Sequence, residues 1–242
     1  MSSERRTAIV AGVLFLVTEI AAIAGLALYR PVLGGAVGVL APGADSRAFL
    51  GALCEVVLAA AVAGTGVALY PVVKRQGEGI ALGYVCGRLL EAAVIAVGIL
   101  SVLSVVTLRQ DLAGAAGVDA ASFAAADRSL VALHDWTFLL GPNIALGLNT
   151  VLLAYLMYRS RLVPRFIAVL GLVGGPLICA SAVAVMFGLY RQVSVPGSAA
   201  ALPVFAWEVS LAVWLLAKGF KRAPAGSGAV APAGGHPSLA GA

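Results

Sequence analysis

Six long apolar stretches run through the chain, and they constrain its fold more than any other feature. Each is long enough to cross the hydrocarbon core of a bilayer, which takes about 20 residues of helix. They cover residues 8–29, 48–70, 80–108, 130–158, 166–190 and 199–220. The sequence therefore predicts an all-α fold, a polytopic transmembrane bundle of about six helices.

The low charge of the chain supports the same class. Charged residues make up 11% of the sequence, against roughly 25% in a soluble globular domain. So few charges cannot cover a water-facing surface. The net charge of +5 is therefore not a nucleic-acid signal, and the basic residues are better interpreted as markers of membrane topology. The expected partner is the lipid bilayer, no nucleic acid is expected, and the oligomeric state stays open.

The basic residues fall unequally on the two sides of the predicted bundle. With the N-terminus inside, ten lie on the cytoplasmic side: Arg5, Arg6, Lys74, Arg75, Arg159, Arg161, Arg165, Lys218, Lys221 and Arg222. Five lie on the other side: Arg30, Arg47, Arg109, Arg128 and Arg191. The positive-inside rule then predicts a multi-pass protein of the cell (inner) membrane with both termini in the cytoplasm.

The sequence also predicts the structure of the two ends of the chain and of its longest connection. The first apolar stretch exceeds the ~7–15 residues of a signal-peptide core and contains Glu19, so we expect it to be retained as a membrane helix. Residues 1–222 form the predicted six-span domain. Residues 223–242 are small, polar and rich in Gly and Pro, which predicts a disordered cytoplasmic tail. Residues 109–129 form the longest connection, in which the pattern after Asp119 predicts a short surface helix.

Seven ionisable residues lie within the apolar stretches. They are Glu19, Glu55, Arg88, Glu91, His134, Asp135 and Glu208. Each costs at least about 2.5–3.5 kcal/mol at the centre of a spanning helix, so we expect them to face inward and to meet one another. Counted along the helices, four of the acids fall in the outer half of the bilayer. This predicts one polar pocket that opens to the outer face.

The charges of this pocket do not balance. Arg88 and Glu91 are three residues apart, so they share a helix face and could form an ion pair that only lowers the cost of insertion. One arginine cannot neutralise five buried carboxylates. The others must be protonated, bound to a cation or in contact with water, because like charges raise one another's proton affinity in a low dielectric.

The stretch from His134 to Asn143 is the most polar part of any apolar segment. Pro142 has no N–H to donate to the carbonyl of Phe138, which leaves that oxygen free. A free carbonyl beside Asn143 is the kind of backbone acceptor that transporters use for cations, so Asn143 joins the pocket candidates. Pro176 has the same effect on Leu172 in the fifth segment. Prolines also kink many membrane helices that bind no ligand.

Three functions follow from these residues, and the sequence leaves them open. The first is a carrier or binder of a cation, a proton or a small polar solute. The second is a structural or partner-binding membrane protein whose buried charges only fix helix packing. The third is a metal-dependent intramembrane hydrolase with His134 as base or ligand. No zinc-protease, nucleophile-elbow or phosphate-loop motif occurs, so no catalytic residue, metal site or cofactor is assigned, and an enzyme is less expected than a non-enzyme.

Several short motifs, in order along the chain, resemble a bacterial membrane-protein family known as domain of unknown function 4386. They are Tyr70-Pro71-Val72-Val73-Lys74-Arg75, Leu82-Gly83-Tyr84, Arg88-Leu89-Leu90-Glu91, the segment 134–142, the segment 156–165 and Trp207-Glu208. The resemblance covers the chain from Thr7 to Phe220. It implies a membrane bundle of six or seven helices and carries no established activity, so it adds no catalytic residues to the candidates above.

Overall fold

The chain is all-helical in the computed structural model, which describes residues 2–34, 43–114 and 119–221. The elements are α1 (Ser3–Leu33), α2 (Ala44–Val73), the short 3-10 helix η1 (Lys74–Gln76), α3 (Glu78–Gly114), α4 (Ala120–Leu139), the π-helical segment η2 (Leu140–Ala145), α5 (Leu146–Ser160), α6 (Arg165–Met186) and α7 (Val195–Ala217). The predicted disordered tail lies outside the described residues.

Six helical segments are long and apolar enough to cross a membrane, which confirms the predicted fold class. The fourth is the longest, because α4, η2 and α5 follow one another without a break over 40 residues. The helices extend past most of the predicted ends, since the helical backbone continues beyond the apolar core. The fifth is shorter than predicted: α6 ends at Met186, and Gly188 adopts the left-handed backbone (φ 75°) that stops a helix.

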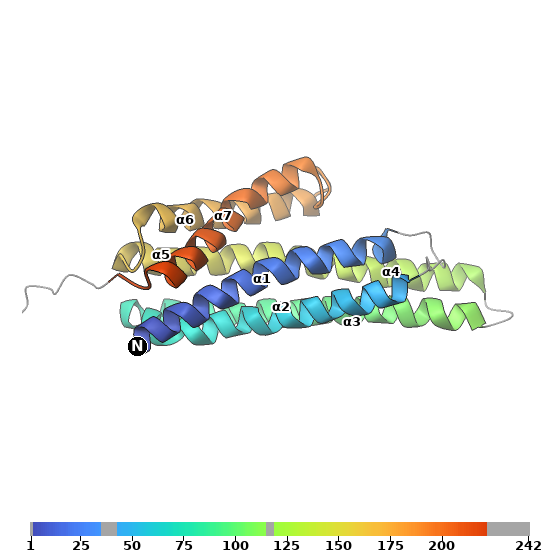
Figure 1. Cartoon of the computed structure of the whole chain (residues 1–242). Coiled ribbons are helices and arrows are strands. Elements are labelled where there is room, and N and C mark those ends of the chain that lie inside the picture. The colour runs from blue at the N-terminus through green and yellow to red at the C-terminus, as the bar shows by residue number, and fades with distance from the viewer. Residues whose placement is uncertain (1, 35–42, 115–118, 222–242) are drawn as a thin grey trace, which may run out of the picture.

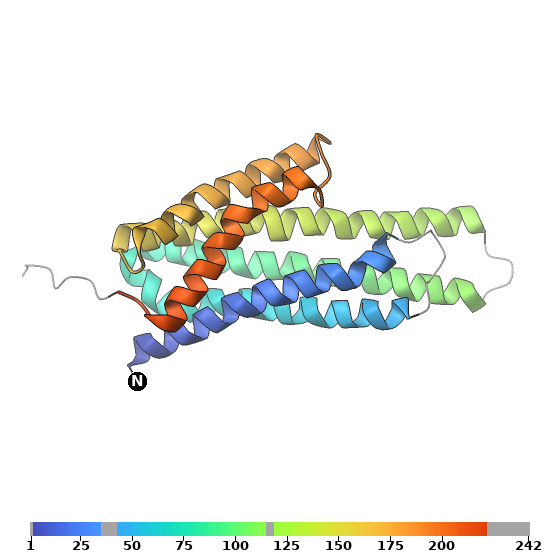
Figure 2. The ribbon, with the colours of Figure 1, turned by 45° about the horizontal axis from the view of Figure 1, so that its top comes forward.

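The helices form a bundle of two parts. Helices α1, α2, α3 and the α4–α5 segment run alongside one another, while α6 and α7 form a hairpin that leans across them (Figure 1). In the rotated view α7 crosses α1 at a clear angle (Figure 2). The N-terminus and the end of α7 lie at the same end of the bundle (Figure 1). We call this the terminal end and the opposite one the distal end.

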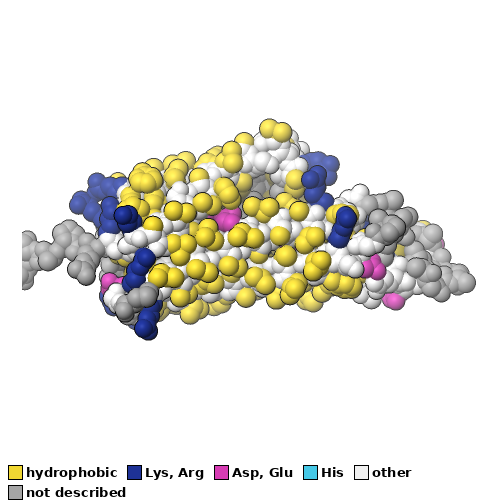
Figure 3. Space-filling model, viewed as in Figure 1, with side chains coloured by type: hydrophobic (Ala, Val, Ile, Leu, Met, Phe, Trp, Pro, Cys, Tyr) yellow, Lys and Arg dark blue, Asp and Glu magenta, His cyan; other side chains and the backbone are white. Residues whose placement is uncertain are grey.

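The side of the bundle is a hydrophobic belt with charged residues at its ends (Figure 3). Inside the belt, the largest fully buried apolar and aromatic side chains include Phe15, Tyr84 and Trp207. Close helix approach depends on small residues. A Cβ added at Gly174 would come within 2.6 Å of the Val204 backbone nitrogen, so glycine is needed for α6 to lie against α7. Helix α6 continues through Pro176, where the sequence predicts a break.

The distal end differs from the predicted long loop. Residues 109–114 belong to α3 and residues 120–129 to α4, so most of the expected connection is helical, and the helix predicted after Asp119 is the first part of α4. Arg109 and Asp127 are not exposed loop charges. They form a buried pair, with 2.6 Å between Arg109 Nε and Asp127 Oδ1, and Arg109 Nη1 donates to the Val32 carbonyl at 2.8 Å. This pair joins α3 and α4 to the end of α1.

Candidate functional site

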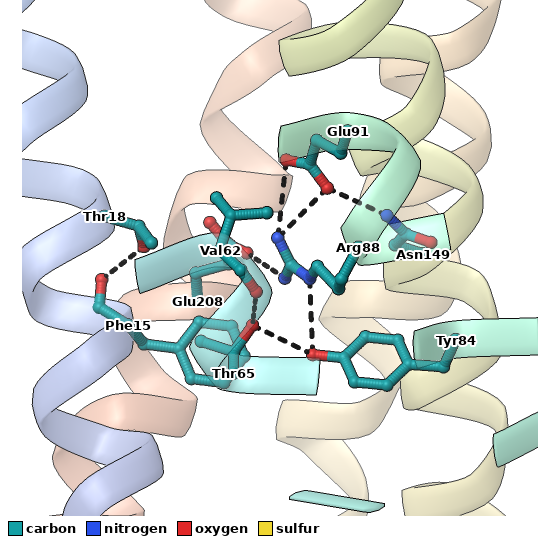
Figure 4. Close-up of polar contacts among 9 residues, drawn as sticks. All are labelled: Phe15, Thr18, Val62, Thr65, Tyr84, Arg88, Glu91, Asn149 and Glu208. Atoms are coloured by element: carbon teal, nitrogen blue, oxygen red, sulfur yellow. Dashed lines mark hydrogen bonds and ion pairs between the residues drawn. The ribbon is translucent and has the colours of Figure 1, made fainter. Parts of the chain in front are cut away.

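Arg88 is the centre of a buried polar network between the helices. Its side chain is only 2% exposed. One guanidinium nitrogen, Nη2, donates to Glu208 Oε1 on α7 at 2.9 Å, and Nη1 donates to Glu91 Oε2 at 3.3 Å. The third, Nε, donates to the hydroxyl of Tyr84 at 3.3 Å. Figure 4 shows this arrangement, in which all three nitrogens of the guanidinium have a partner.

The partners of Arg88 are themselves held in place. Asn149 Nδ2, on α5, donates to Glu91 Oε2 at 2.8 Å. This contact requires α5 to lie very close to α3, and Gly87 allows it, because a Cβ there would overlap the amide of Asn149. The network therefore ties α3 to α5 and α7 (Figure 4). Its aromatic wall is Phe15 of α1, whose ring centre lies 5.5 Å from the guanidinium carbon.

Glu19 adds a further carboxyl group to this network. Glu19 of α1 and Glu208 of α7 face the same space. Both line a cavity of about 220 Å³ together with Arg88, Glu91 and Asn143. The cavity is near the middle of the bundle, since Glu19 lies 16 residues after the start of α1 and 14 before its end. We call it the central cavity.

The walls of the central cavity are mostly apolar, and its exposed lining residues are Ala22 and Ile23 of α1. These residues face the side of the bundle. Acidic side-chain surface also emerges within the hydrophobic belt, where α1 and α7 lie side by side (Figure 3). The sequence predicts a pocket that opens to the outer face, and this opening stays a prediction. Phe138 and Pro142 form part of the cavity wall.

The central cavity has an excess of acidic groups. Three carboxyl groups, those of Glu19, Glu91 and Glu208, meet one guanidinium. Arg88 donates to two of them, and neither of its two ion pairs involves Glu19. An uncompensated carboxylate in an apolar surrounding is costly, so the cavity gains stability from a proton or another positive charge at this point.

Glu55 and His134 lie apart from the Arg88 network. They line a second space of only about 40 Å³, bounded in addition by Phe138 and Pro142. The His134 ring is stacked on Phe138, with 6.2 Å between ring centres, and meets the edge of Tyr29 at 5.6 Å. The predicted single pocket is therefore divided into two neighbouring spaces that share Phe138 and Pro142.

Asp135 lies outside both spaces. Its side chain is 70% exposed and lines a groove of about 500 Å³ between α4 and the segment that joins α6 to α7, which we call the distal groove. This distal groove also includes Arg191 and Gln192. Its Oδ1 lies 3.4 Å from His134 Nδ1, although His134 lines the small inner space and Asp135 lines the groove. The structure does not bring Asp135 together with the other acids.

The carbonyl of Phe138, which the sequence predicts to be free, has two donors. Asn143 Nδ2 donates to it at 3.1 Å and Gln192 Nε2 at 3.3 Å. Pro142 removes the usual helical donor, the backbone becomes π-helical over Leu140–Ala145, and side-chain amides replace the missing N–H. Because two amide groups already donate hydrogen bonds to it, this oxygen is not free to coordinate a cation.

No group of three or more His, Cys, Asp or Glu side chains could hold a metal ion within residues 2–34, 43–114 and 119–221. The metal-dependent hydrolase gains no support from the described part of the chain. The residues that sequence reasoning left out of the site are Tyr84, Asn149 and Phe138. Tyr84 is four residues before Arg88 on the same helix face, a spacing that could have identified it. Asn149 could be found only with the partner helix in place.

The comparisons with known proteins supply the family of this chain. No curated protein and no solved structure matches it significantly. A family model described as "Domain of unknown function (DUF4386)" matches residues 10–219, which span all six membrane helices from the first apolar turns to the end of the last. The chain is thus a multi-pass membrane protein that belongs to the DUF4386 family.

Proposed function

We propose that this protein binds a positively charged ligand, a proton or a small monovalent cation, at the Glu19 and Glu208 carboxyl groups of the central cavity. The observation that carries the proposal is the charge of this cavity: three carboxyl groups from three helices meet a single, fully paired arginine. Such a site in the middle of a membrane bundle is typical of carriers, in which buried acids release and accept cations.

Two further features support a positively charged ligand over an anion. The guanidinium of Arg88 already meets two carboxyl groups, those of Glu91 and Glu208, so an anion would have to compete with them for its charge. The cavity, at about 220 Å³, has room for a small cation with a few water molecules.

A structural role is the second candidate, and the completeness of the Arg88 network favours it. Arg88, Glu91, Asn149 and Glu208 connect three helices, and buried ion pairs often fix helix packing. In this case the excess carboxyl group would stay permanently protonated and would bind nothing. The two candidates therefore differ in whether Glu19 exchanges its proton.

We also propose that the protein lies in the cell (inner) membrane with its terminal end in the cytoplasm. The support is the excess of basic residues at this end, which the positive-inside rule assigns to the cytoplasm.

The melting temperature of the full chain in lipid nanodiscs tests the proposed ligand. We expect it to change with pH and with Na⁺, Li⁺ or K⁺ at an ionic strength held constant with choline chloride, because a bound ligand stabilises the folded state. Glu19→Gln should abolish this dependence. Glu78→Gln, the same change at an exposed position at the start of α3, should retain it. A wild-type melting temperature that responds to neither pH nor cation would overturn the proposal.

A further inference from the structure

Phe138 is the one residue that lines all three of the spaces described above. It lines the distal groove beside Asp135, Arg191 and Gln192, the small space beside His134, and the central cavity beside Glu19. No other residue of the distal groove reaches either inner space, among the residues that the structure describes. Among the described residues, Phe138 is thus the only lining residue that the groove and the central cavity have in common.

The surroundings of the central cavity determine by which route water and cations can reach it. On its exposed side the cavity is bordered by Ala22 and Ile23, within the hydrophobic belt. In a bilayer this side is covered by hydrocarbon chains, which a hydrated cation does not cross. The distal groove is larger, about 500 Å³, and carries charged side chains from Asp135 and Arg191. Water therefore reaches the cavity region most readily from the distal groove.

The position of Phe138 is held from both sides. Its ring is stacked on His134, with an interplanar angle of 10°. Its carbonyl accepts from Gln192, which lines the distal groove, and from Asn143, which lines the central cavity. The small space next to His134, about 40 Å³, lies beside the same residue. These contacts hold Phe138 at the place where the groove and the two inner spaces have it as a common lining residue.

We infer that Phe138 is the specificity-determining barrier between the distal groove and the central cavity, and that it admits water and small cations while it excludes larger ones. This inference rests on the proposed function, since it names the route by which the proposed ligand reaches Glu19 and Glu208. It adds an aromatic residue that has no charge of its own and that sets the size of what can enter.

Cysteine accessibility in the full chain tests the barrier. The native Cys54, Cys86 and Cys179 are replaced by alanine, and Val62→Cys places a thiol in the wall of the central cavity, where the side chain is 1% exposed. The probes are water-soluble methanethiosulfonates with an ethylammonium or a bulkier ethyltrimethylammonium group. The thiolate attacks the probe sulfur to form a mixed disulfide and releases methanesulfinate.

We expect Phe138→Ala to raise the rate of labelling by the bulky probe at least about tenfold, which corresponds to about 1.4 kcal/mol in the barrier. The smaller probe should gain less, so that the preference for it over the bulky one falls. Phe138→Trp should slow both probes. Trp136→Ala is the matched control, because Trp136 lines the distal groove and not the cavity, and it should leave both rates unchanged.

Equal labelling rates with and without the Phe138→Ala substitution would overturn the inference, as would an equal acceleration by Trp136→Ala. Melting temperatures of each variant show that it is folded, and Phe138→Leu replaces Phe138→Ala if the alanine variant is not. Labelling needs no cation at Glu19. If the proposed ligand site is wrong, the labelling rates can therefore still be measured. If the barrier is wrong, the melting temperature should still depend on cations.

Discussion

Arg88 donates to a tyrosine and to two carboxylates, and it thereby sets what its neighbours can do. Glu208 and Glu91 each accept a hydrogen bond from a guanidinium nitrogen of Arg88, and Glu91 accepts a further one from the amide of Asn149. Neither ion pair of Arg88 involves Glu19. At the residue scale the paired acids thus connect the helices, and Glu19 is the proposed site at which a positive charge is exchanged.

Arg88→Met should destabilise the protein strongly. The change leaves two buried acids without their cation, and breaking a buried ion pair costs about 3–5 kcal/mol. Arg88→Lys should recover part of the loss, because an ammonium keeps the charge without the fork geometry of the guanidinium. Reversible unfolding in mixed detergent measures the effect. Arg159→Met, at an exposed position, is the control and should change stability little. A stability equal to wild type in Arg88→Met would contradict the role given to the network.

The sequence was sufficient to identify the charged residues around Arg88, but it was insufficient to identify Tyr84 and Asn149 or to predict how the candidate residues divide between the two spaces. The cost of burying charge identifies Glu19, Arg88, Glu91 and Glu208 without a structure. It says nothing of the direction in which a side chain faces. Asp135 satisfies the same rule, yet it avoids the cost by pointing into the exposed distal groove.

At the scale of the elements, the π-helical segment η2 depends on side chains that replace one missing N–H. Asn143 and Gln192 both donate to the Phe138 carbonyl, so either can satisfy it alone. We expect Asn143→Ala and Gln192→Ala each to cost little, and the double variant to cost about 1–3 kcal/mol, because it leaves the carbonyl with no donor. A double-mutant cycle of unfolding free energies measures this coupling. Strictly additive effects would show that the two amides act independently.

The approach of α5 to α3 depends on Gly87. Gly87→Ala should push Asn149 away from Glu91 and destabilise the protein by about 1–3 kcal/mol, since the added methyl group overlaps the Asn149 amide. Gly79→Ala in the same helix is the matched control. No atom lies within 4 Å of a Cβ at that position, so alanine there should be neutral or stabilise α3 slightly. Thermal unfolding of both variants tests the difference. Equal melting temperatures would contradict the packing argument.

The start of α4 is stabilised by Asp119. Its carboxylate accepts from the Ser122 hydroxyl and from the backbone N–H groups of Ala121 and Ser122, which holds the pKa of Asp119 below its ordinary value. A depressed folded-state pKa means that this stabilisation is present above the ordinary value of 3.8 and is lost as the pH falls through the folded one. Asp119→Ala should therefore speed amide hydrogen exchange in the first turn of α4 at neutral pH. Unchanged exchange would rule out the cap.

The six spans could be predicted from apolar length alone, because a bilayer leaves few alternatives to helices. The distal end could not. Residues 109–129 look like a loop since they carry five charges, but Arg109 and Asp127 neutralise each other inside the bundle. A pairing between two helices is a tertiary contact, and no local pattern reveals it.

At the scale of the whole molecule, this pairing strengthens the charge asymmetry. With Arg109 buried against Asp127, four basic residues remain at the distal side: Arg30, Arg47, Arg128 and Arg191. We expect a C-terminal fusion of green fluorescent protein to fluoresce and a C-terminal alkaline phosphatase fusion to be inactive, since both report a cytoplasmic terminus. The reverse pattern would place the terminal end outside.

The proposed function requires a carboxyl group of the central cavity to exchange a positive charge. Infrared difference spectroscopy of the full chain in nanodiscs, between low and high pH, tests it most directly. We predict a protonated-carboxyl band that disappears at high pH and on addition of the bound cation, that is absent in Glu19→Gln and that persists in Glu78→Gln. Identical difference spectra for wild type and Glu19→Gln would contradict the claim and leave the cavity with a purely structural role.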